Sequence, residues 1–112
     1  MGGGTFDRLS IAAMLIPTND TFVGVNTALP ADGDLKVVYG FAYDAGTEVN
    51  DETCASIPGP NFVECGGPGM GGAPGNGEGS VVISGGILGI GDFGSDRDWK
   101  NPVARITIQK IS

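Results

Sequence analysis

The chain has 112 residues, 21 of them glycine, which allows one domain with a modest core and favours β-structure with many turns over a helical bundle. Its formal net charge of −7 disfavours nucleic acid, which needs a Lys/Arg footprint, and anionic membranes. Because there is no histidine, no Ser-His or Cys-His nucleophile can form, and no apolar run is long enough to span a membrane.

Strand patterns follow one another along the chain. Residues 1–7, with three consecutive glycines, read as an artificial or trimmed terminus, and residues 8–112 read as one domain. An apolar run over 8–16 predicts a strand covered on both faces, and a short strand is predicted at 22–26. Alternation over 35–41 predicts a third strand.

The second half of the chain predicts further strands joined by turns. Residues 81–84 and 87–90 flank two glycines and predict a hairpin. Residues 103–111 predict the last strand, in which Ile106 and Ile108 face one way and the polar residues between and beside them face the other. The Gly-rich segment 66–79 predicts a mobile surface loop, and the alternative is a segment that packs against a neighbouring molecule.

Aromatic residues are predicted to serve the core. Tyr39, Phe41 and Tyr43 form a stripe at strand spacing, which favours core packing over a sugar-stacking surface. Trp99 stands among charged residues and is interpreted as a lid over one end of the core.

Two cysteines, Cys54 and Cys65, close a short Pro-containing loop. With neither histidine nor a further cysteine, a zinc site is disfavoured, and we predict a disulfide, with two free thiols as the alternative. The loop-entropy estimate gives such a bond about 3 kcal/mol of stabilisation. It would imply an oxidising compartment.

Acidic residues stand at the mouths of two turns. Asp20 follows Asn19, and Asp44 precedes Ala45-Gly46. Two such turns at one end of an antiparallel sandwich can bring their carboxylates together, where they repel unless a hard cation lies between them. The alternative for each is an Asx-turn, in which the side chain caps local backbone N–H groups. Three further acids crowd a loop with Arg97 and Lys100, and a solvated loop is favoured over a second hard-cation site because they lack the spacing of an EF-hand loop: Asp92, Asp96 and Asp98.

Three blocks resemble the spondin domain, the domain of F-spondin and mindin that also occurs in secreted bacterial proteins. The blocks lie at 16–25 (IPTNDTFVGV), 43–48 (YDAGTE) and 102–108 (PVARITI). Their order and rough spacing match, the second block is the most specific, and the resemblance covers nearly the whole chain from Leu9 onward.

The resemblance implies an all-β fold, an antiparallel C2-like β-sandwich with one Ca²⁺ at one end. The family's ligand positions correspond to Asp20 and Asp44, and Glu48 could reach the same ion if its loop curls. A family glutamate on an upstream strand has no match here. Thr21 stands where animal members have Trp, Asn26 replaces an acid, Glu48 replaces Asp and the Gly-rich stretch is extra, so the likeness is closest to the bacterial branch.

We therefore expect a secreted or cell-surface, calcium-binding, non-enzymatic module for adhesion or recognition, with an extracellular protein, a glycan or other copies of itself as partner. One alternative is a structural subunit of an extracellular assembly. If the family's upstream strand is missing, the strand at 8–16 or its neighbour has an open edge that can pair with another chain. A weaker alternative is a glycan-binding domain, which should expose an aromatic strip.

Overall fold

The structure is a computed structural model that describes residues 6–16, 18–57, 65 and 75–111. The described chain is mostly β, with two single-turn 3-10 helices, and the predicted all-β class is confirmed. Every strand pairing is antiparallel. The elements are β1 (Arg8–Met14), β2 (Thr21–Ala28), β3 (Leu35–Asp44), η1 (Cys54–Ser56), β4 (Val82–Ile83), η2 (Ser95–Arg97) and β5 (Ala104–Gln109).

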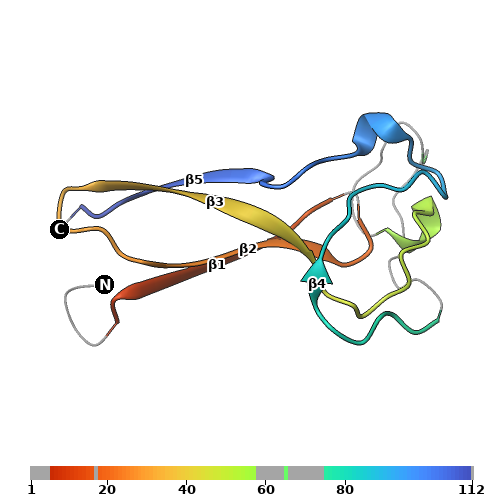
Figure 1. Ribbon diagram of the computed structural model, residues 1–112, viewed down its shortest axis with the longest axis horizontal. Coiled ribbons are helices and arrows are strands. Elements are labelled where there is room, and N and C mark those ends of the chain that lie inside the picture. Colours follow the sequence, from red (N-terminus) through yellow and green to blue (C-terminus); the bar gives the residue numbers. More distant parts are fainter. Residues whose placement is uncertain (1–5, 17, 58–64, 66–74, 112) are drawn as a thin grey trace.

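The sheet has the order β1-β2-β3-β4, and β5 joins it through β3. The long strand β3 pairs with β5 over its first six residues and with β2 and β4 near its end. Figure 1 shows the result as two arms, β1 with β2 and β3 with β5, that diverge from a junction near β4. The sheet is therefore bent, and a C2-like sandwich stays a prediction.

Glycine lets the two arms approach each other. A Cβ at Gly40 would lie 2.5 Å from Val23 Cγ2, so a side chain there would push β2 away from β3. Further along, Lys36 Nζ donates to the Ala28 carbonyl at 2.9 Å. The even-numbered face of β3 therefore looks toward the β1–β2 arm.

This molecule is elongated and buries few large apolar side chains. It measures 46 × 28 × 22 Å, and its radius of gyration is 16.8 Å, against about 13 Å for a compact 100-residue domain. The buried apolar residues among those described are Ala42, Ile57, Phe93 and Ile108. Phe93 and Ile57 lie in the loops beside β4, so part of the core belongs to the loop end rather than to the strands.

The aromatic stripe is largely exposed, which corrects the prediction of core packing. Tyr39 is 60% exposed and Phe41 40% exposed, and they share their face of β3 with exposed Leu35 and Val37. We call these four residues the β3 strip. Only Tyr43 is half-buried, and its ring lies 5.7 Å from that of Phe22. The sequence pattern correctly placed the three aromatic residues on one face of β3. The β1–β2 arm, however, lies against the other face, which carries the even-numbered residues.

Strand β1 is an edge of the described sheet, and the predicted cover on both faces is wrong for it because the even-numbered side chains of β1 are all exposed. Ala12, Ala13 and Met14 are exposed, and β1 ends at Met14 rather than at residue 16. Among the described residues, no helix is long and apolar enough to cross a membrane. Of the Gly-rich segment, residues 66–74 lie outside the described residues.

The predicted strand at 87–90 is also wrong. Residues 82–83 form the short strand β4, but the backbone after it leaves the sheet. The N–H groups of Leu88, Gly89 and Ile90 donate to the Glu52 carboxylate instead of to a neighbouring strand. The apolar run at 87–90 thus forms a loop whose backbone N–H groups bind the buried Glu52 carboxylate.

Candidate metal centre

Strand pairing brings the first two blocks of the spondin-like pattern side by side. Thr21 lies opposite Asp44 in the β2–β3 register, and the Ala45 N–H donates to the Asp20 carbonyl at 3.2 Å. Asp20 directly precedes β2 and Asp44 is the last residue of β3, so both lie at the end of the sheet where β2 begins and β3 ends. That the two turns meet at one end of the sheet is what the sequence predicted.

Asp20 joins the two turns through one oxygen of its carboxylate. Oδ2 accepts hydrogen bonds from Thr47 N at 2.7 Å, Thr47 Oγ1 at 2.6 Å and Glu48 N at 2.9 Å. Oδ1 is buried and has no hydrogen-bond partner within the described part of the chain. A bare buried carboxylate oxygen is costly, and a hard cation is the ligand that such an oxygen prefers.

Asp44 caps its own turn. Its side chain is buried, Oδ1 accepts from Gly46 N at 2.7 Å, and Oδ2 accepts from Asn50 Nδ2. This is the Asx-turn that the sequence allowed as the alternative to ligation. Each carboxylate oxygen has two lone pairs, so the cap leaves capacity for a further ligand.

Glu48 contributes its backbone to the site through the bond to Asp20, and its side chain is half-buried. Among the described residues, no three His, Cys, Asp or Glu side chains form a group that could hold a metal ion. An ion held by Asp20 and Asp44 would need backbone oxygens or water to complete its shell. Ca²⁺ accepts such a mixed oxygen shell.

Gly46 is required where it stands. Its φ is 71°, and a Cβ there would lie 2.2 Å from the Ser80 carbonyl oxygen. The Gly79 N–H donates to the Gly46 carbonyl at 2.8 Å. The end of the Gly-rich segment is thus docked on the turn that carries Asp44.

Glu52 is a buried acid that the sequence did not single out. It has a positive φ of 54°, and its carboxylate accepts from Leu88 N at 2.9 Å, Gly89 N at 3.0 Å and Ile90 N at 3.4 Å. One signal could have indicated this role. The run at 87–91 consists of glycine and aliphatic residues, so its backbone N–H groups need an acceptor from elsewhere.

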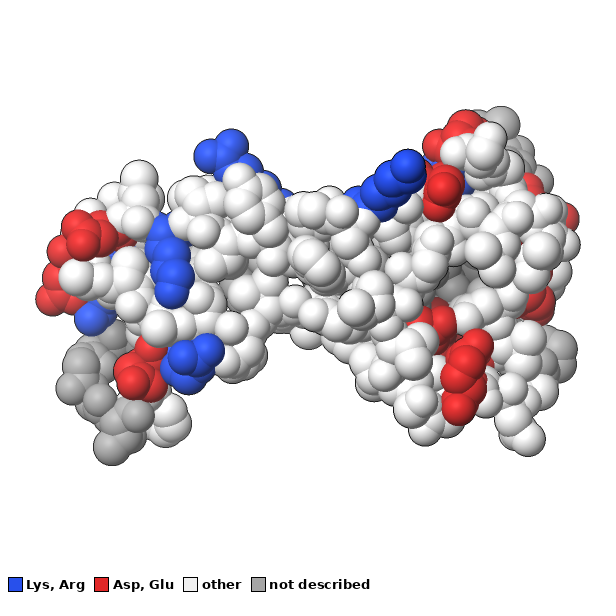
Figure 2. Space-filling model, viewed as in Figure 1, with Lys and Arg blue, Asp and Glu red and all other residues white. Residues whose placement is uncertain are grey.

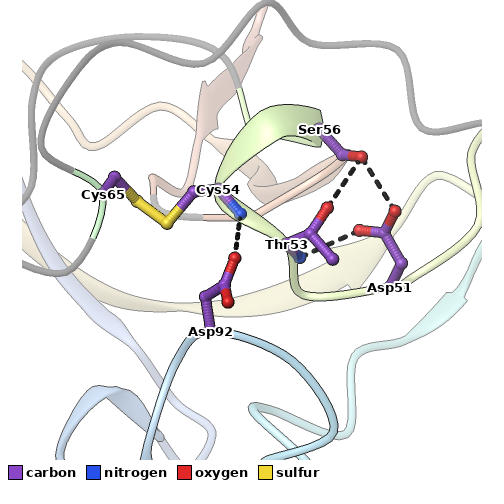
Figure 3. The surroundings of a disulfide bond; sticks show 6 residues. All are labelled: Asp51, Thr53, Cys54, Ser56, Cys65 and Asp92. Carbon is purple, nitrogen blue, oxygen red and sulfur yellow. Dashed lines mark hydrogen bonds between the residues drawn. A yellow bond between two sulfur atoms is a disulfide. The ribbon is translucent and has the colours of Figure 1, made fainter.

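The predicted bond between Cys54 and Cys65 is present, with a Cα–Cα distance of 5.4 Å. Figure 3 shows how two acids hold the chain beside it. Asp92 Oδ2 accepts from Cys54 N at 2.8 Å, and Asp51 accepts from Thr53 N at 3.0 Å and from Ser56 Oγ at 2.8 Å.

Asp51 is the acid whose titration these contacts change. Burial raises the pKa of Asp51, but hydrogen bonds from the Thr53 N–H, the Ser56 and Thr53 hydroxyls and the Asn19 amide outweigh that effect. The net result is a pKa below the ordinary value, because these donors favour the charged form.

A cavity of about 100 Å³ lies between these turns and the loop after β4. Asp44 and Glu52 reach its wall, together with the buried side chains of Thr18, Asn19 and Thr21. Trp99 also lines it, and its Nε1 is buried without a partner among the described residues. Trp99 thus lines a cavity whose wall combines polar side chains with the buried Ile57, and a lid over one end of the core stays a prediction.

The acids of the 92–98 loop are exposed, as expected for a solvated loop, but two of them also hold backbone. Asp92 bonds to Cys54 N, and Asp98 Oδ1 accepts from Ile87 N at 2.9 Å. Figure 2 shows the acidic residues of this face gathered toward the two ends of the molecule, with a largely uncharged waist between them.

Comparison with protein-family models, with curated proteins and with solved structures finds no match to this chain. The spondin-like pattern at 16–25, 43–48 and 102–108 thus stays a prediction made from those residues.

Proposed function

We propose that this chain is an extracellular calcium-binding β module that serves adhesion or recognition. The bare, buried Asp20 Oδ1 carries the proposal, because the other oxygen of the same carboxylate is saturated by three donors. A cation at Oδ1 would offset the cost of burying that oxygen. Asp44 on the adjacent strand supplies a second carboxylate, and the Cys54–Cys65 bond is compatible with an oxidising compartment.

Calcium should stabilise the fold in proportion to the logarithm of its concentration, by about 2.7 kcal/mol at a hundredfold excess over the dissociation constant. The test is thermal unfolding in Ca²⁺ and in chelator, with Mg²⁺ as the comparison ion and calorimetric titration for affinity. Asp20→Asn keeps an acceptor for Thr47 and Glu48 but removes the charge, so we expect at least a tenfold loss of calcium affinity.

Asp96→Asn is the matched control, because Asp96 is exposed in a different loop. Equal unfolding temperatures in calcium and in chelator would reject the metal site. So would an Asp20→Asn variant that binds calcium as tightly as the Asp96→Asn variant.

A glycan-binding role is the second candidate, and the exposed β3 strip favours it. Tyr39 and Phe41 present ring surface on the same face as the polar β5 residues Arg105 and Thr107, which pair with Tyr39 and Val37. Stacking on a sugar needs an exposed aromatic ring with polar groups beside it. Screening against a glycan array tests it, with Tyr39→Ala expected to abolish any signal and Thr107→Ala to reduce it. Equal signals from Tyr39→Ala and the unmodified chain would reject it.

A further inference from the structure

Among the described residues, one complete row of backbone groups on strand β1 has no partner. The Leu15 N–H donates to the Thr21 carbonyl, and the Asp7 carbonyl accepts from Leu29 N, so the odd-numbered residues of this segment point their backbone toward β2. The register has no bulge from Arg8 to Met14. The N–H and C=O groups of the even-numbered residues therefore point to the open side: Arg8, Ser10, Ala12 and Met14.

This edge lacks the features that usually prevent pairing. β1 contains no proline and has one charged residue, Arg8, at its end. Proteins commonly block such edges with prolines, bulges or charges that point inward. Arg8 instead points along the exposed face, where its Nε donates to Asn26 Oδ1 at 2.7 Å. Backbone pairing is thus possible along the whole of β1.

We propose that β1 pairs with β1 of a second copy, antiparallel about a twofold axis at Ile11. This register overlaps all seven residues of the strand, places Arg8 opposite Met14 and Ser10 opposite Ala12, and sets no like charges against each other. Each facing pair of even-numbered residues can exchange two hydrogen bonds.

The side chains favour the same partner. On the face of β1 that carries the half-buried Leu9 and Ile11 and the exposed Ala13, Ile11 would lie beside its own copy and Leu9 beside Ala13, so the apolar row continues from one copy into the next. Few of the described large apolar side chains are buried in a single copy, which leaves stability to be gained by association. The proposal does not rest on calcium, because Asp20 lies in the connection between β1 and β2 and not on the open side of β1.

The first test is sedimentation equilibrium of the full chain over a wide range of concentration. We expect a monomer–dimer equilibrium. Ala12→Pro removes an outward N–H without touching the β1–β2 ladder, and proline is tolerated at such edge positions. It should weaken the dimer at least tenfold, whereas Ala12→Thr, which keeps the N–H, should not.

The second test fixes the register. At the axis, residue 11 forms a non-hydrogen-bonded pair with itself, with Cα atoms about 4.5 Å apart, close enough for a disulfide. Ile11→Cys should therefore form an interchain bond on oxidation. Ala13→Cys should not, because its two copies would lie four residues apart, about 13 Å along the strands.

Three outcomes would overturn the proposal. They are a monomer at all concentrations, a dimer that Ala12→Pro leaves intact, and crosslinking at residue 13 as efficient as at residue 11. The last two would mean that another surface, such as the β3 strip or the β5 edge, makes the contact. An Asp20→Asn variant without calcium binding should still dimerise, which separates this proposal from the calcium site.

Discussion

The strand arms and the loop end of this molecule are held together in different ways. Backbone ladders join β1 to β2 and β3 to β5 in regular registers, and most of their side chains are exposed or half-buried. At the loop end, buried or half-buried carboxylates bind backbone N–H groups from distant segments, as Asp20 and Glu52 do. The acidic composition, which suggested a cation, thus also serves as a set of internal acceptors.

The largest effect should come from removing Glu52, a buried acid that accepts from three backbone N–H groups of a distant segment. Glu52→Ala deletes the acceptor of three loop N–H groups, and we expect a loss of about 4 kcal/mol in the free energy of unfolding. Urea denaturation measures it. Glu78→Ala is the control, because Glu78 is exposed and should change stability by less than about 0.5 kcal/mol. Equal losses would refute the structural role of Glu52.

Replacing one glycine in the loop end and one in a turn of the strand arms compares how tightly the two regions are packed. Gly46 in the loop end and Gly33 in the turn before β3 have similar φ values, 71° and 81°. A Cβ at Gly46 would meet the Ser80 carbonyl, whereas nothing lies within 4 Å of one at Gly33. Gly33→Ala should cost about 1 kcal/mol of backbone strain, and Gly46→Ala about 3 kcal/mol, because the clash adds to the strain. Equal unfolding midpoints in urea would show that the Gly46 turn is not tightly packed.

The smallest effect concerns pH. Because the folded-state pKa of Asp51 is lowered, its contribution to stability is complete above the unfolded pKa of about 3.9 and is lost as pH falls through the folded value. Asp51→Asn should therefore be less stable than the unmodified chain at neutral pH, and the two should converge in acid. Thermal unfolding across pH measures this. Asp32→Asn is the control, since its contact with Lys110 is on the surface and worth little. A gap that stays constant into acid would contradict the assignment.

Local patterns predicted the strands well. Alternation over 35–41 and 103–111 located β3 and β5, although β3 runs on to Asp44 and β5 ends at Gln109. Ile106 and Ile108 do share a face that is more buried than that of Arg105 and Thr107. Alternation does not say which face another layer covers, so Tyr39 was assigned to the core although it is exposed.

Contacts between distant segments could not be predicted in the same way. Glu52 and Leu88 are 36 residues apart, and nothing near either residue indicates the other. The two glycines before Ile87 gave a hairpin signal, but the carboxylate of Glu52 competes for the N–H groups that a second strand would use. For the candidate metal site, the sequence predicted that the turns of Asp20 and Asp44 lie at one end of the sheet, and ligation by the two carboxylates stays a prediction. That Asp20 Oδ1 has no hydrogen-bond partner among the described residues emerged only from the three-dimensional contacts.

Trp99, the only tryptophan in the chain, has an optical consequence. Its side chain lines the cavity at the loop end, far along the chain from the β1–β2 ladder. Fluorescence emission therefore reports the surroundings of one end of the molecule, while far-ultraviolet circular dichroism is dominated by the strands. If the loop end opens before the arms come apart, the emission maximum will shift at a lower denaturant concentration than the dichroism signal, and the two curves will separate.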